Sequence, residues 1–270
     1  MLEMRQVVKI FNRGTIDEKV ALNGLSLTLA DGDFATVIGG NGAGKSTMLN
    51  AISGAWLPDE GKILLGGMDI SGLPEHKRAP YLGRVYQDPM MGTAAGMQIE
   101  ENLALAARRG KRRTLRLGIR KSEREEYRRL LSQLHLGLES RLAAKVGTLS
   151  GGQRQALTLL MATLQKPRLL LLDEHTAALD PKTAATVMSL TEKIVTENRL
   201  TTLMITHNMR DAIQFGNRLM MLHEGRVILD ISGEEKRRLT VSDLLELFTK
   251  ASGSEFVSDR AMLSQGAAAI

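Results

Sequence analysis

The first residues whose types and spacing could do chemistry form a glycine-rich run that ends in a lysine and two hydroxyl side chains. The run fits the pattern G-x-x-x-x-G-K-[ST], in which backbone N–H groups and the lysine bind phosphate oxygens and the first hydroxyl binds Mg²⁺. An apolar strand is expected before it and a helix after it, so the positive end of that helix would point at the phosphates. The stretch predicts a nucleotide phosphate site, with Lys45 on the outer phosphates and Ser46 on Mg²⁺. The members of the run are Gly39, Gly40, Asn41, Gly42, Ala43, Gly44, Lys45, Ser46 and Thr47.

Two carboxylates follow a second apolar strand, the four leucines at 169–172. Adjacent residues on a strand point to opposite faces, so Asp173 and Glu174 are expected to do different jobs. We expect Asp173 to hold Mg²⁺ and Glu174 to act as the base for an attacking water or to orient it. Two adjacent acids at a strand end are often only solvated; the phosphate loop in the same chain favours the catalytic interpretation.

A third stretch, Ser150, Gly151, Gly152 and Gln153 after Leu149, begins a long predicted helix. Serine followed three residues later by glutamine is a capping-box pattern, so Ser150 could simply cap this helix. Two glycines in a first helical turn cost about 1 kcal/mol each relative to alanine. Glycines are expected at a helix N-terminus in spite of this cost where a ligand must approach the backbone closely. A γ-phosphate bound by free N–H groups is such a ligand.

The order of the phosphate loop, the LSGGQ stretch and the acidic strand resembles the ATPase subunits of the ABC superfamily, over roughly residues 1–245. The resemblance implies an α/β P-loop NTPase core, with an N-terminal antiparallel β subdomain and an α-helical subdomain inserted at about 89–166. It implies an ABC domain over 1–250 and a flexible tail at 251–270. It also implies ATP hydrolysis with Mg²⁺ in a head-to-tail dimer, where the LSGGQ stretch of one subunit closes on the ATP held by the other.

Four single residues take roles from this resemblance. Gln87 matches a glutamine that touches Mg²⁺ and links the core to the helical subdomain, and His207 matches a histidine on the γ-phosphate. Asp180 matches a loop that crosses the dimer seam, although it could equally cap the helix that begins at Pro181. Phe11 is the candidate to stack on adenine; the alternative for an N-terminal phenylalanine is ordinary core packing.

Two positions depart from the family pattern. His175 follows Glu174 where the family mostly has proline, so the rigidity of that loop is expected to differ. Gly40 stands where proline or serine is commoner and should be tolerated. Neither departure removes a catalytic group.

Apolar periodicity and turn residues predict elements typical of an α/β core. Strands are expected near 7–10, 25–29, 34–38, 63–68, 169–172, 202–206, 218–222 and 226–231. Helices are expected near 46–53, 100–109, 123–136, 150–166, 181–198 and 209–215. Strands that alternate with helices in the second half indicate a parallel sheet, closed by a hairpin that turns at 224–225.

Composition limits the class of protein. The 270 residues carry a net charge of +6 and no cysteine, and no run approaches the roughly 18 apolar residues of a membrane span. Since no signal peptide is visible, we expect a cytoplasmic polypeptide, and the resemblance to ABC ATPases implies a peripheral position on the cytoplasmic face of the inner membrane. The segment 108–129 has eleven Lys or Arg against three Glu, a net +8. It could be a solvated helical face or a contact with anionic lipid; nucleic acid is disfavoured because aromatic residues are nearly missing from it.

The function expected from the resemblance is the ATP-hydrolysing subunit of a bacterial transporter. Since no span is visible, separate transmembrane permease subunits must carry the solute, and the motif order favours an importer that works with an extracytoplasmic solute-binding protein. The runs 88–93 and 175–180 resemble a group thought to import amino-acid-like solutes. A homodimer is expected. The alternatives are a membrane signalling or force-transmitting ATPase and, less favoured, a nucleic-acid ABC ATPase, whose coiled-coil insertions or second cassette are not seen.

Overall fold

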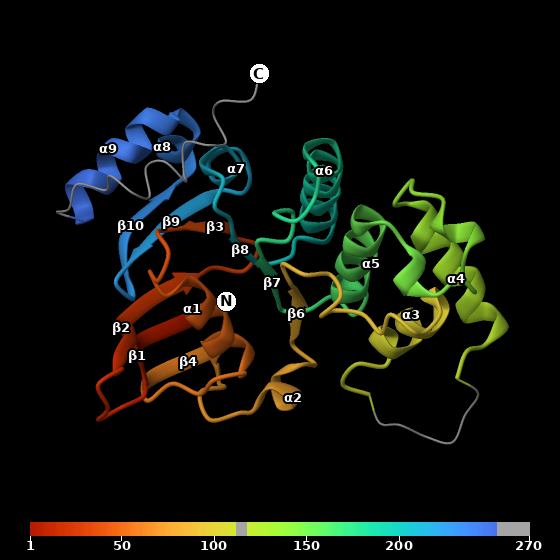
Figure 1. The fold of residues 1–270 in the computed structure, drawn as a ribbon, viewed down its shortest axis with the longest axis horizontal. Helices are drawn as coiled ribbons and strands as arrows, with labels where there is room; N and C mark the ends of the chain where they lie inside the picture. Colours follow the sequence, from red (N-terminus) through yellow and green to blue (C-terminus); the bar gives the residue numbers. More distant parts are fainter. Residues whose placement is uncertain (112–117, 253–270) are drawn as a thin grey trace. The chain divides into compact units, whose positions relative to one another are not determined.

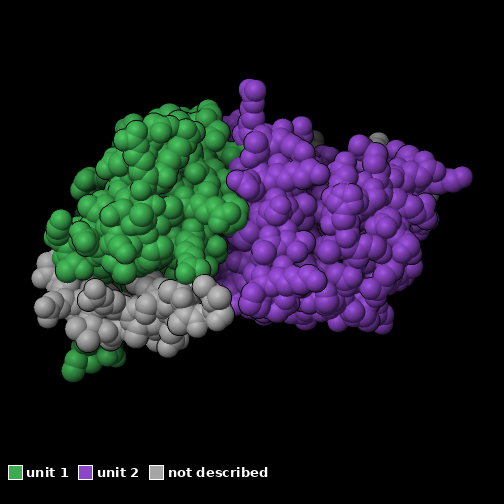
Figure 2. All heavy atoms as spheres, turned by 90° about the horizontal axis from the view of Figure 1, so that it is seen from above, with its two compact units in different colours: residues 1–78, 200–270 green, residues 79–199 purple. Residues whose placement is uncertain are grey.

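The structure is a computed structural model that describes residues 1–111 and 118–252. Its contacts divide the chain into two compact units (Figure 2): residues 1–78 with 200–270 form unit 1, and residues 79–199 form unit 2. The expected helical insertion at 89–166 falls inside unit 2. The expected tail from 253 onward lies outside the described residues.

Unit 1 contains the antiparallel sheet expected from the N-terminal sequence, in the order β2-β1-β4-β5 (Figure 1). These strands are β1 (Leu2–Phe11), β2 (Lys19–Leu29), β4 (Glu60–Leu65) and β5 (Met68–Asp69). Apolar residues alternate along β2, where Leu25, Leu27 and Leu29 are buried between exposed neighbours. One face of this sheet is therefore core and the other is polar.

A second group of strands in unit 1 is built around β3 (Phe34–Ile38), whose five residues are all buried. Strands β8 (Thr202–Ile205) and β9 (Arg218–His223) pair with it in parallel, and β10 (Arg226–Ser232) pairs antiparallel with β9. Because β3 and β8 are parallel, Gly39 and His207 follow strands that end at the same edge. Ligands of open α/β sheets bind outside this carboxyl edge.

The described part of unit 1 also contains helices, most of which pack against these strands. They are α1 (Lys45–Ser53), α2 (Glu75–Arg78), α7 (Met209–Gln214), α8 (Gly233–Arg238) and α9 (Val241–Ser252). Leu244 and Phe248 of α9 are buried with Met221 of β9 and Ile38 of β3. The Thr36 hydroxyl donates to the carbonyl of Ala212, 2.8 Å away, and ties β3 to α7. This core fixes the strand from which the phosphate loop departs.

Unit 2 combines two parallel strands with a helical region. Strand β6 (Leu82–Val85) pairs in parallel with β7 (Leu169–Asp173), and the helices are α3 (Ile99–Ala107), α4 (Lys121–Ser132), α5 (Gly151–Thr163) and α6 (Pro181–Asn198). Two short 3-10 turns, Leu138–Ser140 and Val146–Thr148, precede α5. Leu103 of α3, Leu131 of α4 and Leu157 of α5 are fully buried in one cluster. The helical core places the beginning of α5.

The described part of the basic segment makes ion pairs inside unit 2. Arg124 donates two hydrogen bonds to the buried carboxylate of Glu100, at 2.8 and 2.9 Å, and Arg108 pairs with Glu123 at 3.0 Å. These arginines therefore balance local carboxylates. Residues 112–117 of the segment lie outside the described residues, and none of the described helices has both the length and the apolar character of a membrane span.

Candidate nucleotide site

The two units carry different parts of the predicted site. Unit 1 contains Phe11, the phosphate loop and His207; unit 2 contains Gln87, the Ser150–Gln153 stretch, Asp173, Glu174 and Asp180. Each part has its own local structure, which shows whether the residues can do what the sequence predicts.

The phosphate loop is shaped by three glycines in left-handed backbone conformations. Gly39, Gly42 and Gly44 have φ angles of 153°, 78° and 100°. A Cβ at Gly39 would lie 2.3 Å from the carbonyl oxygen of Leu222, and one at Gly44 would lie 2.6 Å from that of Ala21. Neither position has room for any side chain, so the loop depends on glycine for space as well as for conformation.

Lys45, the first residue of α1, is buried inside the loop that precedes it. Its ammonium group donates to the carbonyl oxygens of Gly39 and Gly40, at 2.7 and 3.0 Å. Ser46 is exposed on the first turn of the helix. Here a positive charge, a helix N-terminus and a glycine backbone meet, and these are the groups that hold phosphate oxygens. The cradle fits a nucleotide triphosphate.

The turn between β9 and β10 supports the loop from behind. The N–H of Gly225 donates to the carbonyl of Ala43 at 3.0 Å, and the N–H of Asn23 donates to the carbonyl of Gly225 at 3.1 Å. This hairpin turn was expected from the sequence, but its role as a backing for the phosphate loop was not. Nothing in the local pattern Glu224–Gly225 distinguishes such a turn from an exposed one.

His207 lies exposed just beyond β8, at the strand edge from which the phosphate loop leaves β3. The N–H of Thr206 continues the pairing with β3 by donating to the carbonyl of Val37 at 3.1 Å. Asn208 then caps α7, because its side-chain oxygen accepts from the N–H of Arg210 at 2.9 Å. The histidine is thus held between a strand end and a capped helix, and its contact with a γ-phosphate stays a prediction.

Phe11 ends β1 close to the phosphate loop. Its partner across the sheet is Lys19, and the Lys19 ammonium lies 3.6 Å from where a Cβ would stand on Gly42. The ring is half-buried and packs edge-on against Trp56, with ring centroids 4.7 Å apart. The length of one lysine side chain therefore spans the gap between the residue paired with Phe11 and the phosphate loop. The stacking of Phe11 on adenine stays a prediction.

In unit 2, Asp173 is the last residue of β7 and is largely buried. Arg84 of β6 lies beside it, with its guanidinium 3.4 Å from the Asp173 carboxylate and 4.5 Å from the centroid of the Tyr86 ring. The partnership follows from the parallel pairing of β6 with β7, in which Arg84 lies opposite Leu171. We did not expect it, since an arginine on a strand gives no signal of its partner.

Glu174 leaves the strand in a left-handed turn, with φ 47°. A glutamate in this conformation costs about 1–3 kcal/mol, which the surrounding structure must offset. We expected strand alternation to separate the two carboxylates, and this reason is wrong. Glu174 lies after the end of the strand, and the change of backbone direction there separates its carboxylate from that of Asp173. The turn is closed by the N–H of Ala177, which donates to the Glu174 carbonyl at 2.9 Å.

His175, where proline was expected, fastens this turn to α6. The imidazole is 2% exposed and its Nε2 lies 3.0 Å from the hydroxyl of Thr191. That hydroxyl donates its hydrogen to the carbonyl of Val187, so it accepts from the Nε2–H of the histidine. Burial lowers the pKa of His175 to about 4, so the ring is neutral near pH 7. A hydrogen bond to α6 thus constrains the loop in this chain.

Gln87 is exposed just after β6 and lies on a loop that α5 holds. The fully buried side chain of Gln155, on α5, donates through its Nε2 to the carbonyl of Tyr86 at 3.2 Å. Since β6 and β7 are parallel and in register, Gln87 emerges beside Asp173 and Glu174. The helix that follows LSGGQ is therefore connected to the residue before Gln87.

The Ser150–Gln153 capping box is present. The Gln153 N–H donates to the Ser150 hydroxyl at 3.3 Å, and the Ser150 N–H donates to the Gln153 side chain at 3.2 Å. Gly152 is buried, and a Cβ there would lie 2.1 Å from the Thr183 methyl group on α6. This glycine is needed for helix packing, whereas Gly151 and Ser150 remain exposed. Capping is thus confirmed, and the contact of this stretch with phosphate stays a prediction.

Asp180 caps α6, as one of its two interpretations expected. Its carboxylate accepts from the N–H of Thr183 at 3.1 Å, and the hydrogen bonds from Thr183 lower the pKa of Asp180. The side chain is exposed, so it can also meet a second subunit. The loop before it and Gly151 are neighbours, because a Cβ on Gly151 would lie 3.3 Å from the Leu179 side chain.

Residues that could hold Mg²⁺ are few. Across residues 1–111 and 118–252, no three His, Cys, Asp or Glu side chains gather in a way that could hold a metal ion. Mg²⁺ at nucleotide sites is bound through one or two protein oxygens together with the phosphates. In unit 1 the exposed Ser46 hydroxyl, and in unit 2 the Asp173 carboxylate, are each an oxygen ligand of this kind; that they bind Mg²⁺ stays a prediction.

The chain matches the family model described as "ABC transporter" over residues 22–177. It is 46% identical to a tyrosine transport ATP-binding protein of Clostridioides difficile (strain R20291), over 93% of this chain and 100% of that protein. It is 36% identical to the methionine import ATP-binding protein MetN of Rhizobium johnstonii over 77% of this chain, and it spans 56% of that longer protein.

Solved structures agree in fold. A dimeric post-hydrolysis state of the ATP-binding cassette MJ0796 bound to ADP and Pi is similar to 86% of this chain and 98% of its own, at 28% identity and a TM-score of 0.74. The ADP conformation of the cassette MJ1267 covers 92% of this chain and 98% of its own, at 26% identity and a TM-score of 0.75. The expected fold class, a P-loop NTPase of the ABC ATPase type, is confirmed.

The phosphate loop gives a direct test of its steric design. Gly44→Ala and Gly42→Ala both put alanine in a left-handed conformation, at about 1–2 kcal/mol. Only Gly44→Ala adds a collision with backbone, since a Cβ on Gly42 would lie 3.6 Å from the flexible Lys19 ammonium. Forcing an extra atom against packed neighbours costs typically about 1–3 kcal/mol. At roughly 2–4 °C per kcal/mol, we expect the unfolding midpoint of Gly44→Ala to lie about 2–12 °C below that of Gly42→Ala. Equal midpoints measured by calorimetry would contradict the packing argument.

Proposed function

The chain belongs to the ABC transporter family, and from this membership we propose that it is the ATP-hydrolysing subunit that drives import of a small amino-acid-like solute. The observation that carries the amino-acid assignment is the 46% identity to a tyrosine transport ATP-binding protein over that protein's full length, and the 36% identity to a methionine import ATP-binding protein supports import. ATP and Mg²⁺ are the cofactors. A protein of this kind works at the cytoplasmic face of the inner membrane, attached to separate permease subunits that receive solute from an extracytoplasmic binding protein.

We assign the nucleotide-holding roles to unit 1. The backbone N–H groups of the phosphate loop and the Lys45 ammonium bind the outer phosphates, and the Ser46 hydroxyl binds Mg²⁺. Phe11 takes the adenine ring, and His207 contacts the γ-phosphate. Mg²⁺, when bound, neutralises charge that develops on the phosphate oxygens during transfer.

We assign the hydrolytic roles to unit 2. Asp173 would bind Mg²⁺ through its carboxylate, whose Oδ2 lies 3.4 Å from the Arg84 guanidinium. Glu174 orients the attacking water and accepts its proton; the left-handed turn and the His175–Thr191 bond fix where that carboxylate stands. Gln87, on the loop that follows β6, couples changes in the site to the position of that loop.

A second copy of the chain completes each site. The exposed Ser150 and Gly151, at the N-terminus of a thirteen-residue helix, offer N–H groups and a helix dipole to a γ-phosphate held by the other copy. Asp180 and Leu179 lie next to this surface and would face the same interface between the two copies. Support comes from the dimeric state of the structural relative bound to ADP and Pi.

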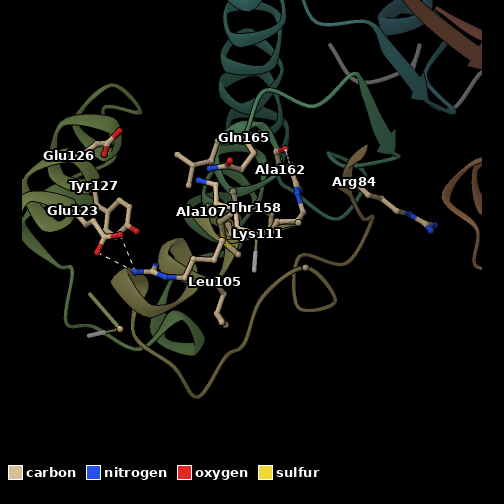
Figure 3. A pocket seen from close by; sticks show the side chains of 18 of the residues that line it. Arg84, Leu105, Ala107, Lys111, Glu123, Glu126, Tyr127, Thr158, Ala162 and Gln165 are labelled. Carbon is tan, nitrogen blue, oxygen red and sulfur yellow. Dashed lines mark hydrogen bonds and ion pairs between the residues drawn. The ribbon is translucent and has the colours of Figure 1, made fainter. Parts of the chain in front are cut away.

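The loop after Gln87 and the hollow next to it suit the membrane partner. Met91 and Met90 are 70% and 43% exposed, so their side chains are not part of the core. Gly92 lines a hollow of about 1000 Å³ in unit 2, where Leu105 is 49% exposed (Figure 3). The charged residues on its wall are mostly cationic: Arg84, Arg108, Arg109, Lys111, Arg120, Glu123 and Glu126. We propose that it takes a short helix of the permease with an apolar anchor and an acidic residue.

The hydrolytic assignment is tested with Glu174→Gln. The amide keeps the shape of the side chain but cannot accept a proton, so we expect turnover to fall about 10²–10⁴-fold while ATP binding is retained. ATP should then hold a stable dimer that gel filtration detects with Mg²⁺ and ATP. The matched control is Lys45→Ala in the Glu174→Gln background, which should stay monomeric. Turnover in Glu174→Gln equal to that of the unchanged protein would overturn the role of Glu174.

The docking surface is tested with Met91→Asp. A carboxylate on this exposed position should leave the unfolding midpoint and ATP binding of the isolated subunit unchanged, because surface substitutions cost within about 0.5 kcal/mol. Co-purification with the permease should be lost. Ile16→Asp, at a fully exposed apolar residue of unit 1, is the control and should assemble normally. Normal assembly and transport by Met91→Asp would place the docking surface elsewhere.

A further inference from the structure

The one tryptophan of the chain contacts the residue that we assign to adenine. The rings of Trp56 and Phe11 meet at 77°, with centroids 4.7 Å apart, in the edge-to-face geometry that aromatic rings favour. Trp56 is 40% exposed and Phe11 is half-buried. The pair therefore keeps aromatic surface open to solvent in unit 1, and no role in the proposed mechanism uses Trp56.

Trp56 also connects this pair to the helix of the phosphate loop. Gly54 ends α1 in a left-handed turn, and the N–H groups of Gly54 and Trp56 both donate to the carbonyl of Asn50, at 3.0 and 3.3 Å. Trp56, three residues after the end of α1, is thus positioned by the last turn of that helix. The same helix begins at Lys45, inside the phosphate loop.

Asp59 fixes the segment that carries Trp56 to the strand that carries Phe11. Its carboxylate accepts from the N–H of Ile10 at 2.6 Å and from the Lys9 ammonium at 3.2 Å. Its own N–H donates to the carbonyl of Val8 at 2.9 Å. The segment 56–59 is therefore joined to the end of β1 at Asp59, by both backbone and side-chain hydrogen bonds.

The distance of Phe11 from the phosphate loop suits a contact with the base of a nucleotide whose phosphates lie in that loop. Lys19 pairs with Phe11 across the sheet, and its ammonium extends to Gly42 of the phosphate loop. The Lys9 ammonium lies 5.7 Å from the centroid of the Phe11 ring. The Phe11 ring thus meets the indole edge-to-face and lies near a cation, and its cross-strand partner Lys19 reaches the phosphate loop.

We infer that Trp56 is a positioning residue that holds the Phe11 ring for the purine base, so that α1 links the base-binding and phosphate-binding ends of the site. The inference rests on the proposed role of Phe11 with adenine. Trp56 acts through Phe11: it sets the orientation of the ring before the nucleotide arrives, which lowers the entropy cost of stacking. It gives no contribution to binding of the phosphates.

The intrinsic fluorescence of Trp56 tests this inference, because the chain has one tryptophan. MgATP and MgADP should change its emission saturably, whereas Mg-tripolyphosphate, which carries no base, should bind without doing so. A response to tripolyphosphate as large as that to ATP would show that the indole senses α1 alone and would overturn the inference.

Affinities measured by calorimetry give the second readout. Trp56→Ala should weaken ATP binding about three- to tenfold, in the range of one aromatic pair, and leave tripolyphosphate binding unchanged. Trp56→Phe, which keeps a ring edge, should retain most of the affinity. Leu57→Ala, at the adjacent and equally exposed apolar residue, is the control and should bind ATP normally. Equal losses for ATP and tripolyphosphate, or an unchanged ATP affinity in Trp56→Ala, would contradict the positioning role.

The double substitution separates this inference from the proposal on which it rests. If Trp56 acts through Phe11, Trp56→Ala should cost nothing further in a Phe11→Ala background. Additive losses would overturn the inference while leaving Phe11 as the adenine contact. If Phe11→Ala binds ATP as tightly as the unchanged protein, the assignment of Phe11 itself is wrong.

Discussion

The structure depends on one steric constraint: backbone must come within contact distance of backbone around the phosphate loop. Gly39 faces the carbonyl of Leu222 and Gly44 faces that of Ala21, with no room for a side chain at either place. Strands β9 and β2 therefore pack against the loop and limit its conformation. The hydrogen bond from Gly225 to Ala43 holds the loop against the β9–β10 turn. Because the loop is built against neighbouring strands, its backbone conformation is set without a ligand, and Lys45 is held within it by the carbonyls of Gly39 and Gly40. Binding then costs little further ordering of the chain.

In unit 2, close packing around α6 has a similar role. The first turn of α6 packs on Gly152 at the start of α5, and the middle of α6 holds His175 through Thr191. One helix thus supports both the LSGGQ end of α5 and the turn that carries Glu174. Gln155 adds a bond from α5 to the end of β6. A displacement of α5 or α6 would be felt at several proposed catalytic residues together, which is what a subunit that couples ATP hydrolysis to a partner's movement requires.

The sequence predicted the features that depend on neighbours along the chain. The phosphate loop, the capping box at Ser150, the cap at Asp180 and the strand–helix order of the second half are set by residues a few positions apart, and the structure contains all of them. It did not predict contacts between residues far apart whose types are ordinary, such as Arg84 with Asp173, His175 with Thr191 and Trp56 with Phe11. The separation of Asp173 from Glu174 was attributed to strand alternation, whereas a left-handed turn produces it; a glutamate carries no local signal for that conformation.

The central claim is that each catalytic site combines the phosphate loop of one copy with the LSGGQ stretch of another. It is tested most directly by ATP hydrolysis in an equal mixture of two variants, Lys45→Ala and Ser150→Arg. Each variant alone should be inactive, because every dimer lacks one half of both sites. In the mixture, half of the dimers should contain one intact site, so activity should return to roughly a quarter of that of the unchanged protein if the two sites act independently. A mixture that stays as inactive as its components would mean that composite sites do not form or that both sites must be intact together. A Ser150→Arg protein that is fully active alone would contradict the account.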